Sequence, residues 1–334
     1  MTTPVMHADY ENKVFTFDHS TQAVACDRKL YWSEVKKIKK LKTAVPLHFG
    51  KALHKFVEHF WLKHPGQECI QEYLKVVRSE NSPIVDDIES DENRTVQRGL
   101  DVCIWYAEHY AAQRQETEIV VINGVPLVEV SFAIPIGVDE DGWTYMYAGR
   151  LDRVEKYRND IRLVDTKSTS RMGKSFWNML RPNDQFTGYW KGIMDFTGIK
   201  PDRFIVDCIY VGEPRKANEN GKFSVPGAVK KMGDVAVEQW MKNVSFEQGP
   251  TRRSDADLQR WQVNTFQEGL RLRNLWMTPG YMPCWTMRTS QCNIFGECPY
   301  RDLCNLTDNI QPVIDALYTH DDWSPFKKDD ESDG

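Results

Sequence analysis

Residues 143–169 constrain the fold more than any other part of the chain, because they place charged side chains inside two predicted strands. The segments WTYMYAGRLDRVEKY and DIRLVDTKS are joined at Arg158-Asn159-Asp160. Strand interiors favour apolar and β-branched residues, yet Asp152, Asp165 and Lys167 stand within these segments. Residues two apart in a strand share a face, so Asp165 and Lys167 point the same way. A turn at 158–160 would pair the strands and bring Asp152 close to Asp165.

This arrangement of charge has two interpretations. Converging carboxylates repel each other unless a cation lies between them, and Mg²⁺ is usually held by one or two carboxylates plus water. Lys167 beside such an ion would orient a water molecule or stabilise a developing charge. The alternative is an exposed set of ion pairs, and a D-x-K tripeptide alone is too common to decide between them.

The hydrophobic pattern along the rest of the chain changes its period several times. Helical spacing covers 47–64, where Pro65 and Gly66 end the helix, and returns in a longer helix at 92–115. A period of two follows, with a hairpin turn at Asn123-Gly124. Later segments are a helix capped by Asn183, a buried strand at 201–212, a loop rich in Gly, Pro and Lys at 213–233 and a helix at about 254–277. This order predicts a mixed α/β core with helical additions.

Residues outside the strand pair add to the candidate site. Gly50 and His54 are four residues apart, at the edge of the apolar stripe of the first helix. Glu129 is an acidic residue within a β-rich segment, and Gln185 and Tyr189 share one face of the helix after the second strand. Each signal is weak alone, since a single His at such a position is more often a core residue than a metal ligand.

Taken in order, these segments resemble the PD-(D/E)xK nuclease superfamily, in the branch of RecB- and AddB-type nuclease domains that includes the iron–sulfur nucleases of CRISPR adaptation. The family order is G-x-x-x-H, an acidic residue in the next strand region, G-x-(I/L)-D, D-x-K and Q-x-x-x-Y. The matching segments span about 140 residues: GKALH at 50–54, Glu129, GRLD at 149–152, DTK at 165–167 and QFTGY at 185–189. The resemblance implies a restriction-endonuclease-like fold, with a mixed central sheet flanked by helices.

The same resemblance implies a metal site. It places His54, Asp152 and Asp165 on a divalent ion, Mg²⁺ or Mn²⁺, with the backbone carbonyl of Thr166 as a further ligand. The reaction would be metal-assisted hydrolysis of a phosphodiester bond.

The resemblance also implies roles for the residues around the ion. Lys167 would orient the attacking water or stabilise charge. Gln185 and Tyr189 would position the substrate or support this lysine, and Glu129 would touch the site or brace it.

Cysteines provide the second chemical signal. Among the eight in the chain, Cys292, Cys298 and Cys304 are clustered near the end with five residues between neighbours, and Cys26 lies near the start. Four thiolates bind an iron–sulfur cluster or zinc. The N-terminus lacks the layout of a secretory signal, which argues against disulfides. Apolar or helical contexts predict ordinary core residues at Cys69, Cys103 and Cys208.

The resemblance narrows the interpretation of the clustered cysteines. Many members of this branch hold a [4Fe–4S] cluster with one Cys before the nuclease core and three after it, and CDRKLYW and CPYRDLC are similar to those two parts. We therefore expect Cys26, Cys292, Cys298 and Cys304 to hold a structural cluster that ties the chain ends together. The chain departs from the commoner C-x₂-C-x₅-C ending, so Cys284 competes with Cys292. Zinc and unconnected thiols stay open as alternatives.

Charge and composition limit which partners the chain could bind. The net charge is −5, yet a predicted basic helix at 33–42 and the loop at 213–233 are locally basic and could bind phosphate. Trp177 and Trp190 could line a groove for a nucleic-acid strand or pack in the core. No apolar run approaches the roughly 20 residues that a membrane helix needs. We therefore expect a soluble cytoplasmic protein of a bacterial or phage-infected cell.

The expected organisation is one nuclease domain at 1–325, with a catalytic core at about 45–212, a cluster region formed by about 20–32 and 284–306, and an acidic disordered tail at 326–334. The favoured function is a metal-dependent DNA nuclease, an exonuclease acting on single strands or DNA ends in recombination or repair. The alternatives are an inactive iron–sulfur DNA-binding scaffold of the same fold and a nuclease of RNA. The sequence holds no helicase motif, so unwinding would need a helicase or recombination partner.

Overall fold

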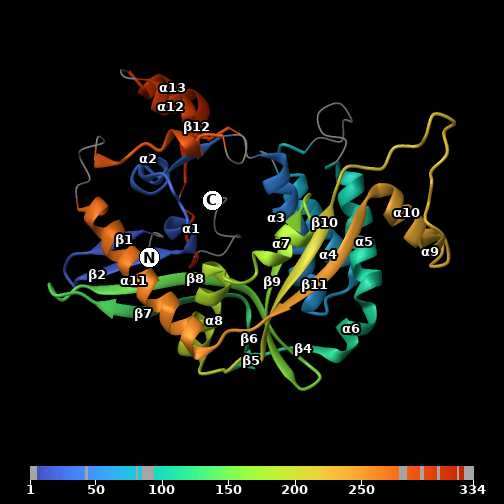
Figure 1. The fold of residues 1–334 in the computed structure, drawn as a ribbon, viewed down its shortest axis with the longest axis horizontal. Coiled ribbons are helices and arrows are strands. Elements are labelled where there is room, and N and C mark those ends of the chain that lie inside the picture. The colour runs from blue at the N-terminus through green and yellow to red at the C-terminus, as the bar shows by residue number, and fades with distance from the viewer. Residues whose placement is uncertain are drawn as a thin grey trace.

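A mixed sheet of eight strands forms the centre of the described part of the chain (Figure 1). The computed structural model describes residues 6–41, 44–79, 82–84, 94–277, 284–293, 297–306, 309–321 and 323–326. The strands of the sheet are β1 (His7–Asp9), β2 (Val14–Asp18), β4 (Thr117–Ile119), β7 (Val128–Val138), β8 (Thr144–Tyr157), β9 (Asp160–Thr169), β10 (Arg203–Val211) and β11 (Val244–Thr251).

The remaining elements surround this sheet. Two small sheets pair β3 (Ile38–Lys40) with β12 (Tyr318–His320) and β5 (Val121–Ile122) with β6 (Val125–Pro126). The helices are α1 (His19–Gln22), α2 (Asp27–Leu30), the π-helix η1 (Tyr31–Val35), α3 (Val45–Trp61), α4 (Gly66–Val77), α5 (Val96–His109), α6 (Ala111–Glu116), α7 (Lys174–Asn178), α8 (Asp184–Thr197), α9 (Gly227–Lys230), α10 (Asp234–Lys242), α11 (Asp255–Trp276), the 3₁₀-helix η3 (Thr289–Gln291), α12 (Arg301–Asn305) and α13 (Gln311–Leu317). Among the described helices, none combines the length and the apolar character that crossing a membrane requires.

The two faces of the sheet carry separate hydrophobic cores. Along β10, Phe204 and Val206 belong to one core and Ile209 and Val211 to the other, as the alternation of side chains in a strand requires. Helices α8 and α11 pack on the first face, and α3, α4 and α5 pack on the second (Figure 1). The expected fold class is confirmed: a mixed central sheet flanked by helices, consistent with a restriction-endonuclease-like fold.

Local predictions hold where short-range chemistry decides the conformation. The side chain of Asn183 caps α8 by accepting a hydrogen bond of 2.9 Å from the backbone N–H of Phe186. Asn123 and Gly124 have φ angles of 52° and 81°, as the tight turn between β5 and β6 requires. The predicted turn after Tyr157 joins β8 and β9 as an antiparallel hairpin.

The predicted basic helix at 33–42 is wrong. The helical segment of α2 and η1 ends before Lys37, which has a left-handed φ of 50°. The next residues form β3, which pairs antiparallel with β12 near the other end of the chain. A partner so distant in sequence supplies the backbone hydrogen bonds, and no local pattern could indicate it. The predicted helix at 92–115 is divided at Tyr110 into α5 and α6 within its described residues.

Strand β8 exchanges one neighbour for another along the same edge. β2 pairs with it as far as Asp18, opposite Ala148, and β9 pairs with it from Val164, opposite Arg153. β7 occupies the other edge of β8 over this whole stretch. Strands β2 and β9 therefore diverge from one edge of β8 and leave an opening in the sheet beside residues 149–152. We call this opening the β8–β9 wedge.

The two ends of the described chain pack together beside the sheet, where α2 lies close to β12 and α12 (Figure 1). The backbone N–H of Arg28 donates to the carbonyl of Thr286 at 3.1 Å, and its Nε donates to the carbonyl of Trp285 at 3.0 Å. The indole rings of Trp32 and Trp285 are fully buried. We call residues 26–40, 284–293, 297–306 and 309–320 the terminal clamp. Of the tail expected at 326–334, residues 327–334 lie outside the described chain.

Candidate active site

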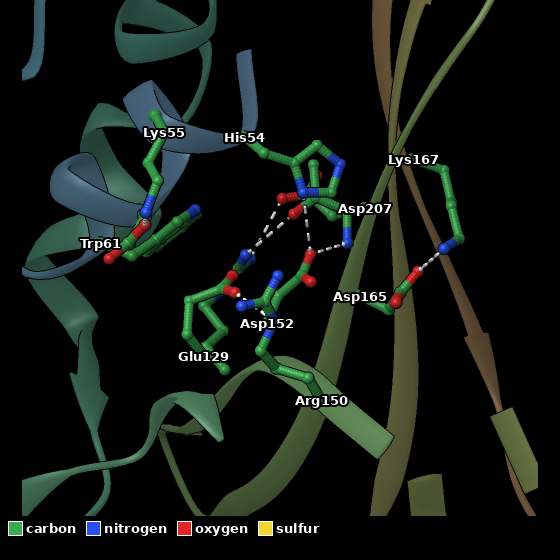
Figure 2. Close-up of polar contacts among 12 residues, drawn as sticks. His54, Lys55, Trp61, Glu129, Arg150, Asp152, Asp165, Lys167 and Asp207 are labelled. Carbon is green, nitrogen blue, oxygen red and sulfur yellow. Dashed lines mark hydrogen bonds and ion pairs between the residues drawn. The ribbon is translucent and has the colours of Figure 1, made fainter. Parts of the chain in front are cut away.

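Asp152 and Asp165 lie on the two strands that border the β8–β9 wedge. They are the next residues beyond the last paired positions, Arg153 and Val164, and both line the cleft above the wedge. The backbone N–H of Thr166 donates to Oδ2 of Asp152 at 2.6 Å (Figure 2). The hairpin register thus brings the two carboxylates to one place and anchors Asp152 to the neighbouring strand.

Helix α3 brings His54 to these carboxylates. Its Nδ1 lies 3.5 Å from Oδ2 of Asp152. Gly50, four residues earlier, allows the helix to approach β9, because a Cβ at this position would lie 2.7 Å from Oγ of Ser168. In the G-x-x-x-H segment, the glycine therefore allows the helix to pack closely and the histidine provides the side chain that faces Asp152.

Lys167 and Asp165 form a close ion pair on the same face of β9. Nζ of Lys167 lies 2.7 Å from Oδ2 of Asp165. Burial raises the pKa of Asp165 to about 6; the charge of Asp152 adds to this effect and the charge of Lys167 opposes it. Burial would lower the pKa of Lys167, but Asp165 and Asp152 outweigh it and raise that pKa. The lysine is therefore a cation at neutral pH.

Glu129 enters the site from β7 and is held by an arginine. Nε of Arg150, the second residue of the GRLD segment, lies 3.0 Å from Oε2 of Glu129. Burial, and after it the charge of Asp152, raises the pKa of Glu129 to about 8. The φ angle of Glu129 is 49°, an uncommon conformation for a residue with a side chain, and such strain is concentrated at functional sites.

Gln185 and Tyr189 face the cleft from α8 as a hydrogen-bonded pair. Nε2 of Gln185 donates to Oη of Tyr189 at 3.1 Å. The close packing of this helix depends on Gly149, since a Cβ there would lie 3.1 Å from Cε1 of Tyr189 and 2.6 Å from the ring of Phe132. The glycine of GRLD thus makes room for the tyrosine of QFTGY.

The cleft above the wedge has a volume of about 620 Å³ and includes residues that the sequence analysis missed. Asp18 and His19 enter it where β2 ends, Lys51 and Lys55 enter from α3, and Trp323 enters from the end of the described chain. Burial, and after it the charge of Lys167, lowers the pKa of His19 to about 4, so this imidazole is neutral at pH 7. The only signal for Asp18 in the sequence is its role as a helix cap, because its side chain forms a capping box with Thr21.

A buried ionic network joins Arg153 on β8 to Glu155 and Asp207, beside the wedge. Nε of Arg153 lies 2.8 Å from Oε2 of Glu155, and Nη2 lies 3.1 Å from Oδ2 of Asp207. Nη1 donates to Oγ1 of Thr166 at 3.3 Å. Because the backbone of Thr166 holds Asp152, the network braces the carboxylate from behind. This network was not predicted, although the charged residues inside predicted strands were an available signal for it.

The donor set at the wedge fits a hard divalent ion. His54 offers nitrogen, and Asp152, Asp165 and the Thr166 carbonyl offer oxygen. The ligand atoms of His54, Asp152 and Asp165, all described, do not come within 4.8 Å of one another, since Asp165 turns Oδ2 to Lys167. The burial of Asp165 supports the fit, because burial raises the pKa of this carboxyl to about 6 and a cation beside it would favour its charged form.

The expected cluster cysteines lie in the terminal clamp. The backbone N–H of Arg288 donates to Sγ of Cys26 at 3.4 Å, and the N–H of Cys298 donates to the carbonyl of Cys292 at 2.8 Å. Burial raises the pKa of the Cys304 thiol; a hydrogen bond with Trp32 and the charge of Arg28 oppose this effect, and Cys298 and Cys26 add to it. The other cysteines differ in exposure. Cys284 is exposed, whereas Cys69, Cys103 and Cys208 are buried, as expected of core residues.

Two groups that could have formed a nucleic-acid groove lie elsewhere. Trp190 is buried in the core, and the ring of Trp177 packs at the position where Gly249 lacks a side chain. Among the described residues that line the cleft, none belongs to the loop at 213–233. Core packing is therefore the interpretation that holds for both tryptophans.

Comparison with known families assigns the chain. The family model of the PD-(D/E)XK nuclease superfamily matches residues 15–305, a span that contains the wedge, α3, α8 and the clustered cysteines. The chain therefore belongs to the PD-(D/E)XK nuclease superfamily, as the ordered motifs predicted.

Two solved structures are similar at low identity. A protein from Eubacterium rectale described as a "Putative exonuclease" has a TM-score of 0.43 and 10% identity, over 82% of this chain and 80% of that chain. The protein SSO0001 has a TM-score of 0.32 and 12% identity, over 91% of this chain and 91% of that chain. Likeness at this level carries no argument about activity. A comparison with curated proteins found no match.

Proposed function

We propose that this chain is a divalent-metal-dependent deoxyribonuclease, an exonuclease that acts on single-stranded DNA or DNA ends in recombination or repair. The observation that supports it is the convergence of Asp152, Asp165 and Lys167 at the β8–β9 wedge, with His54 facing them from α3. A carboxyl group with a raised pKa, here Asp165, beside a lysine in a cleft is typical of a functional site.

Each residue at the wedge has a distinct task. His54, Asp152, Asp165 and the Thr166 carbonyl would hold Mg²⁺ or Mn²⁺, which when bound polarises the phosphate and lowers the pKa of its water. Lys167 donates hydrogen bonds to the attacking water or to a phosphate oxygen, where it stabilises the developing negative charge. Its ion pair with Asp165 holds the ammonium group at the same point.

Gln185 and Tyr189 would orient the substrate beside the lysine. The amide of Gln185 donates to the phenol oxygen, so the amide carbonyl can accept from water or substrate. Burial, and after it the charge of Asp165, raises the pKa of Tyr189, so the phenol keeps its proton and can donate it to a phosphate oxygen. Glu129 braces Arg150 at the edge of the cleft.

The shape and lining of the cleft favour one strand over a duplex. Its volume of about 620 Å³ is in the range of small-molecule pockets, roughly 300–1,000 Å³, which leaves room for a few nucleotide units of a single strand. Lys51, Lys55 and Arg150 can contact backbone phosphates, and the ring of Trp323, 5.8 Å from the Arg150 guanidinium carbon, can stack on a base.

A structural [4Fe–4S] cluster in the terminal clamp is part of the proposal. A tetrahedral zinc ion with bonds of about 2.3 Å would hold its sulfurs roughly 3.8 Å apart. Four thiolates also suit an iron–sulfur cluster, and the sequence resemblance favours this cluster over zinc. Cys26, Cys292, Cys298 and Cys304 would hold it.

The test is anaerobic purification with a visible spectrum, followed by cleavage assays with Mg²⁺ or Mn²⁺. Substrates are 5′- and 3′-labelled single- and double-stranded DNA and an RNA of the same sequence. We expect a coloured protein that shortens single-stranded DNA from an end, and loss of cleavage with retained DNA binding in Lys167→Ala. Equal cleavage by Lys167→Ala would overturn the enzyme assignment, and preference for RNA would overturn the substrate.

A further inference from the structure

Three potential metal ligands converge where α3 meets α4, outside the β8–β9 wedge. Nδ1 of His59, near the end of α3, lies 2.9 Å from Nδ1 of His64 in the following turn. Oε1 of Glu68, in the first turn of α4, lies 3.0 Å from Nδ1 of His64 and 3.8 Å from Nδ1 of His59. Among the described residues this is the one group of three whose ligand atoms all lie within 4.8 Å of one another.

A single proton cannot satisfy both short contacts of this group. If Nδ1–H of His59 donates to His64, the lone pair of His64 also faces the carboxylate of Glu68 at 3.0 Å. If Nδ1–H of His64 donates to Glu68, the same nitrogen has no lone pair to accept from His59. A cation placed between the three atoms interacts favourably with all of them, since each then presents a lone pair.

The turn that carries these ligands is held from behind. Nε and Nη2 of Arg114 donate to the carbonyls of Phe60 and His64 at 2.7 and 2.8 Å. Lys63 adopts a left-handed φ of 63°, so the chain reverses sharply between the two histidines. The backbone is thus fixed by contacts that do not use the imidazole rings or the carboxylate, and the ligand atoms stay directed at one another.

The chemistry of the group differs from that at the wedge. Two imidazole nitrogens and one carboxylate oxygen suit a transition-metal dication, whereas Mg²⁺ prefers oxygen ligands. The side chains of His59, His64 and Glu68 are 19%, 35% and 45% exposed, so a water molecule can complete a tetrahedron. The nearby Cys69 is not one of the ligands, since its thiol donates to the carbonyl of His64 at 3.7 Å. Burial raises the pKa of this thiol.

We propose that His59, His64 and Glu68 form a second metal site that binds a transition-metal dication of the zinc type. The ion joins the end of α3 to the start of α4. Helix α3 also carries His54, so occupancy stabilises the helix that presents this residue to Asp152. The site is structural and takes no direct part in the nuclease chemistry.

The experiment uses the whole chain, purified anaerobically and treated with a chelator to remove loosely bound metal. Zn²⁺ affinity is measured by competition with a chromophoric chelator, and thermal unfolding is followed with and without Zn²⁺. We compare the unaltered protein, the double variant His59→Ala/His64→Ala, the milder variant Glu68→Gln and the control His7→Ala. Co²⁺ spectra separate this site from the cysteines, because thiolate ligands add charge-transfer bands that His and Glu lack.

Besides any Zn²⁺ held at the wedge, we expect one Zn²⁺ equivalent that raises the Tm of the unaltered protein and of His7→Ala. Loss of a group that only supports a ligand weakens metal binding about 10–100-fold, so loss of a ligand in either cluster variant should weaken Zn²⁺ binding at least as much and abolish the Tm shift. Unchanged Zn²⁺ affinity in Glu68→Gln overturns the proposal. The proposal is also overturned if the cluster variants lower the Tm by the same amount in chelator and in Zn²⁺. That result would mean that the three side chains stabilise the protein through hydrogen bonds alone.

Discussion

The β8–β9 wedge and the terminal clamp gather reactive side chains by opposite means. At the wedge, Asp152 and Asp165 come from strands joined by one hairpin, and the buried Arg153 network braces them through Thr166. In the clamp, the cysteines come from opposite ends of the chain. The contacts of the Cys26 sulfur are long, at 3.4 Å from the N–H of Arg288 and 3.9 Å from the carbonyl of Thr286.

The difference concerns what keeps each group in place. The polypeptide alone can hold the wedge, because its ion pairs and hydrogen bonds are already made. The clamp holds its backbone through β3, β12 and Arg28, but four free thiols provide little cohesion unless they share a ligand. Damage to the wedge should therefore affect chemistry first, and damage to the clamp should affect the order of the chain ends first.

The largest effect is expected from Lys167→Ala, which tests whether the wedge serves chemistry alone. Removing one preorganised donor to a developing charge typically costs about 10²–10³-fold in kcat. We expect a loss of this size in a cleavage assay with Mg²⁺, with an unchanged cluster spectrum. The control is Lys156→Ala, an exposed position on the same hairpin, which should cleave normally. Loss of the visible absorption in Lys167→Ala would show that the wedge and the terminal clamp do not act independently.

Arg153→Met tests the brace behind the wedge. It leaves Glu155 and Asp207 buried without their shared cation, and breaking a buried ion pair typically costs about 3–5 kcal/mol. We expect the free energy of unfolding in urea to fall by this amount. Arg158→Ala is the matched control, since its pair with Glu116 is exposed and should be worth about 0–1 kcal/mol.

Cys304→Ser tests the clamp. We expect loss of the visible absorption and faster proteolysis between residues 284 and 306, because the segment then loses its shared ligand. The sheet should unfold at nearly the same temperature, with a Tm change of about 1–2 °C, which is roughly 1 kcal/mol for a chain of this size. Cys284→Ser should keep the absorption, since this thiol is exposed. If Cys284→Ser bleaches and Cys292→Ser does not, the ligand assignment must be exchanged.

The smallest effect is a pH shift at the wedge. The pKa of Asp165 is raised from 3.8 to about 6, so the folded protein takes up this proton before the unfolded chain does as the pH falls. The group therefore opposes folding above pH 6 and ceases to do so as the pH falls below it. Metal binding requires the carboxylate form, so cleavage at low Mg²⁺ should decline below about pH 6. Higher Mg²⁺ should move this decline to lower pH, and a decline independent of Mg²⁺ would contradict the assignment.

Features made by neighbours in sequence were predictable. The Asn183 cap, the Asn123-Gly124 turn and the β8–β9 hairpin each depend on a few adjacent residues. The pairing of Lys167 with Asp165 followed from the alternation of one strand. The prediction of a basic helix at 33–42 was wrong because residues 38–40 form β3, and their partner β12 lies far away in the sequence.

The sequence by itself determined which side chains could do chemistry and, through the ordered motifs, the superfamily to which the chain belongs. Only the tertiary structure decided where β2 leaves β8, and with it the cleft that Asp18 and His19 enter. Only the tertiary structure placed Arg153 against Asp207 and His59 against Glu68. The physical reason is that strand exchange and helix packing depend on contacts between segments far apart in sequence, whereas periodicity and capping act within a few residues.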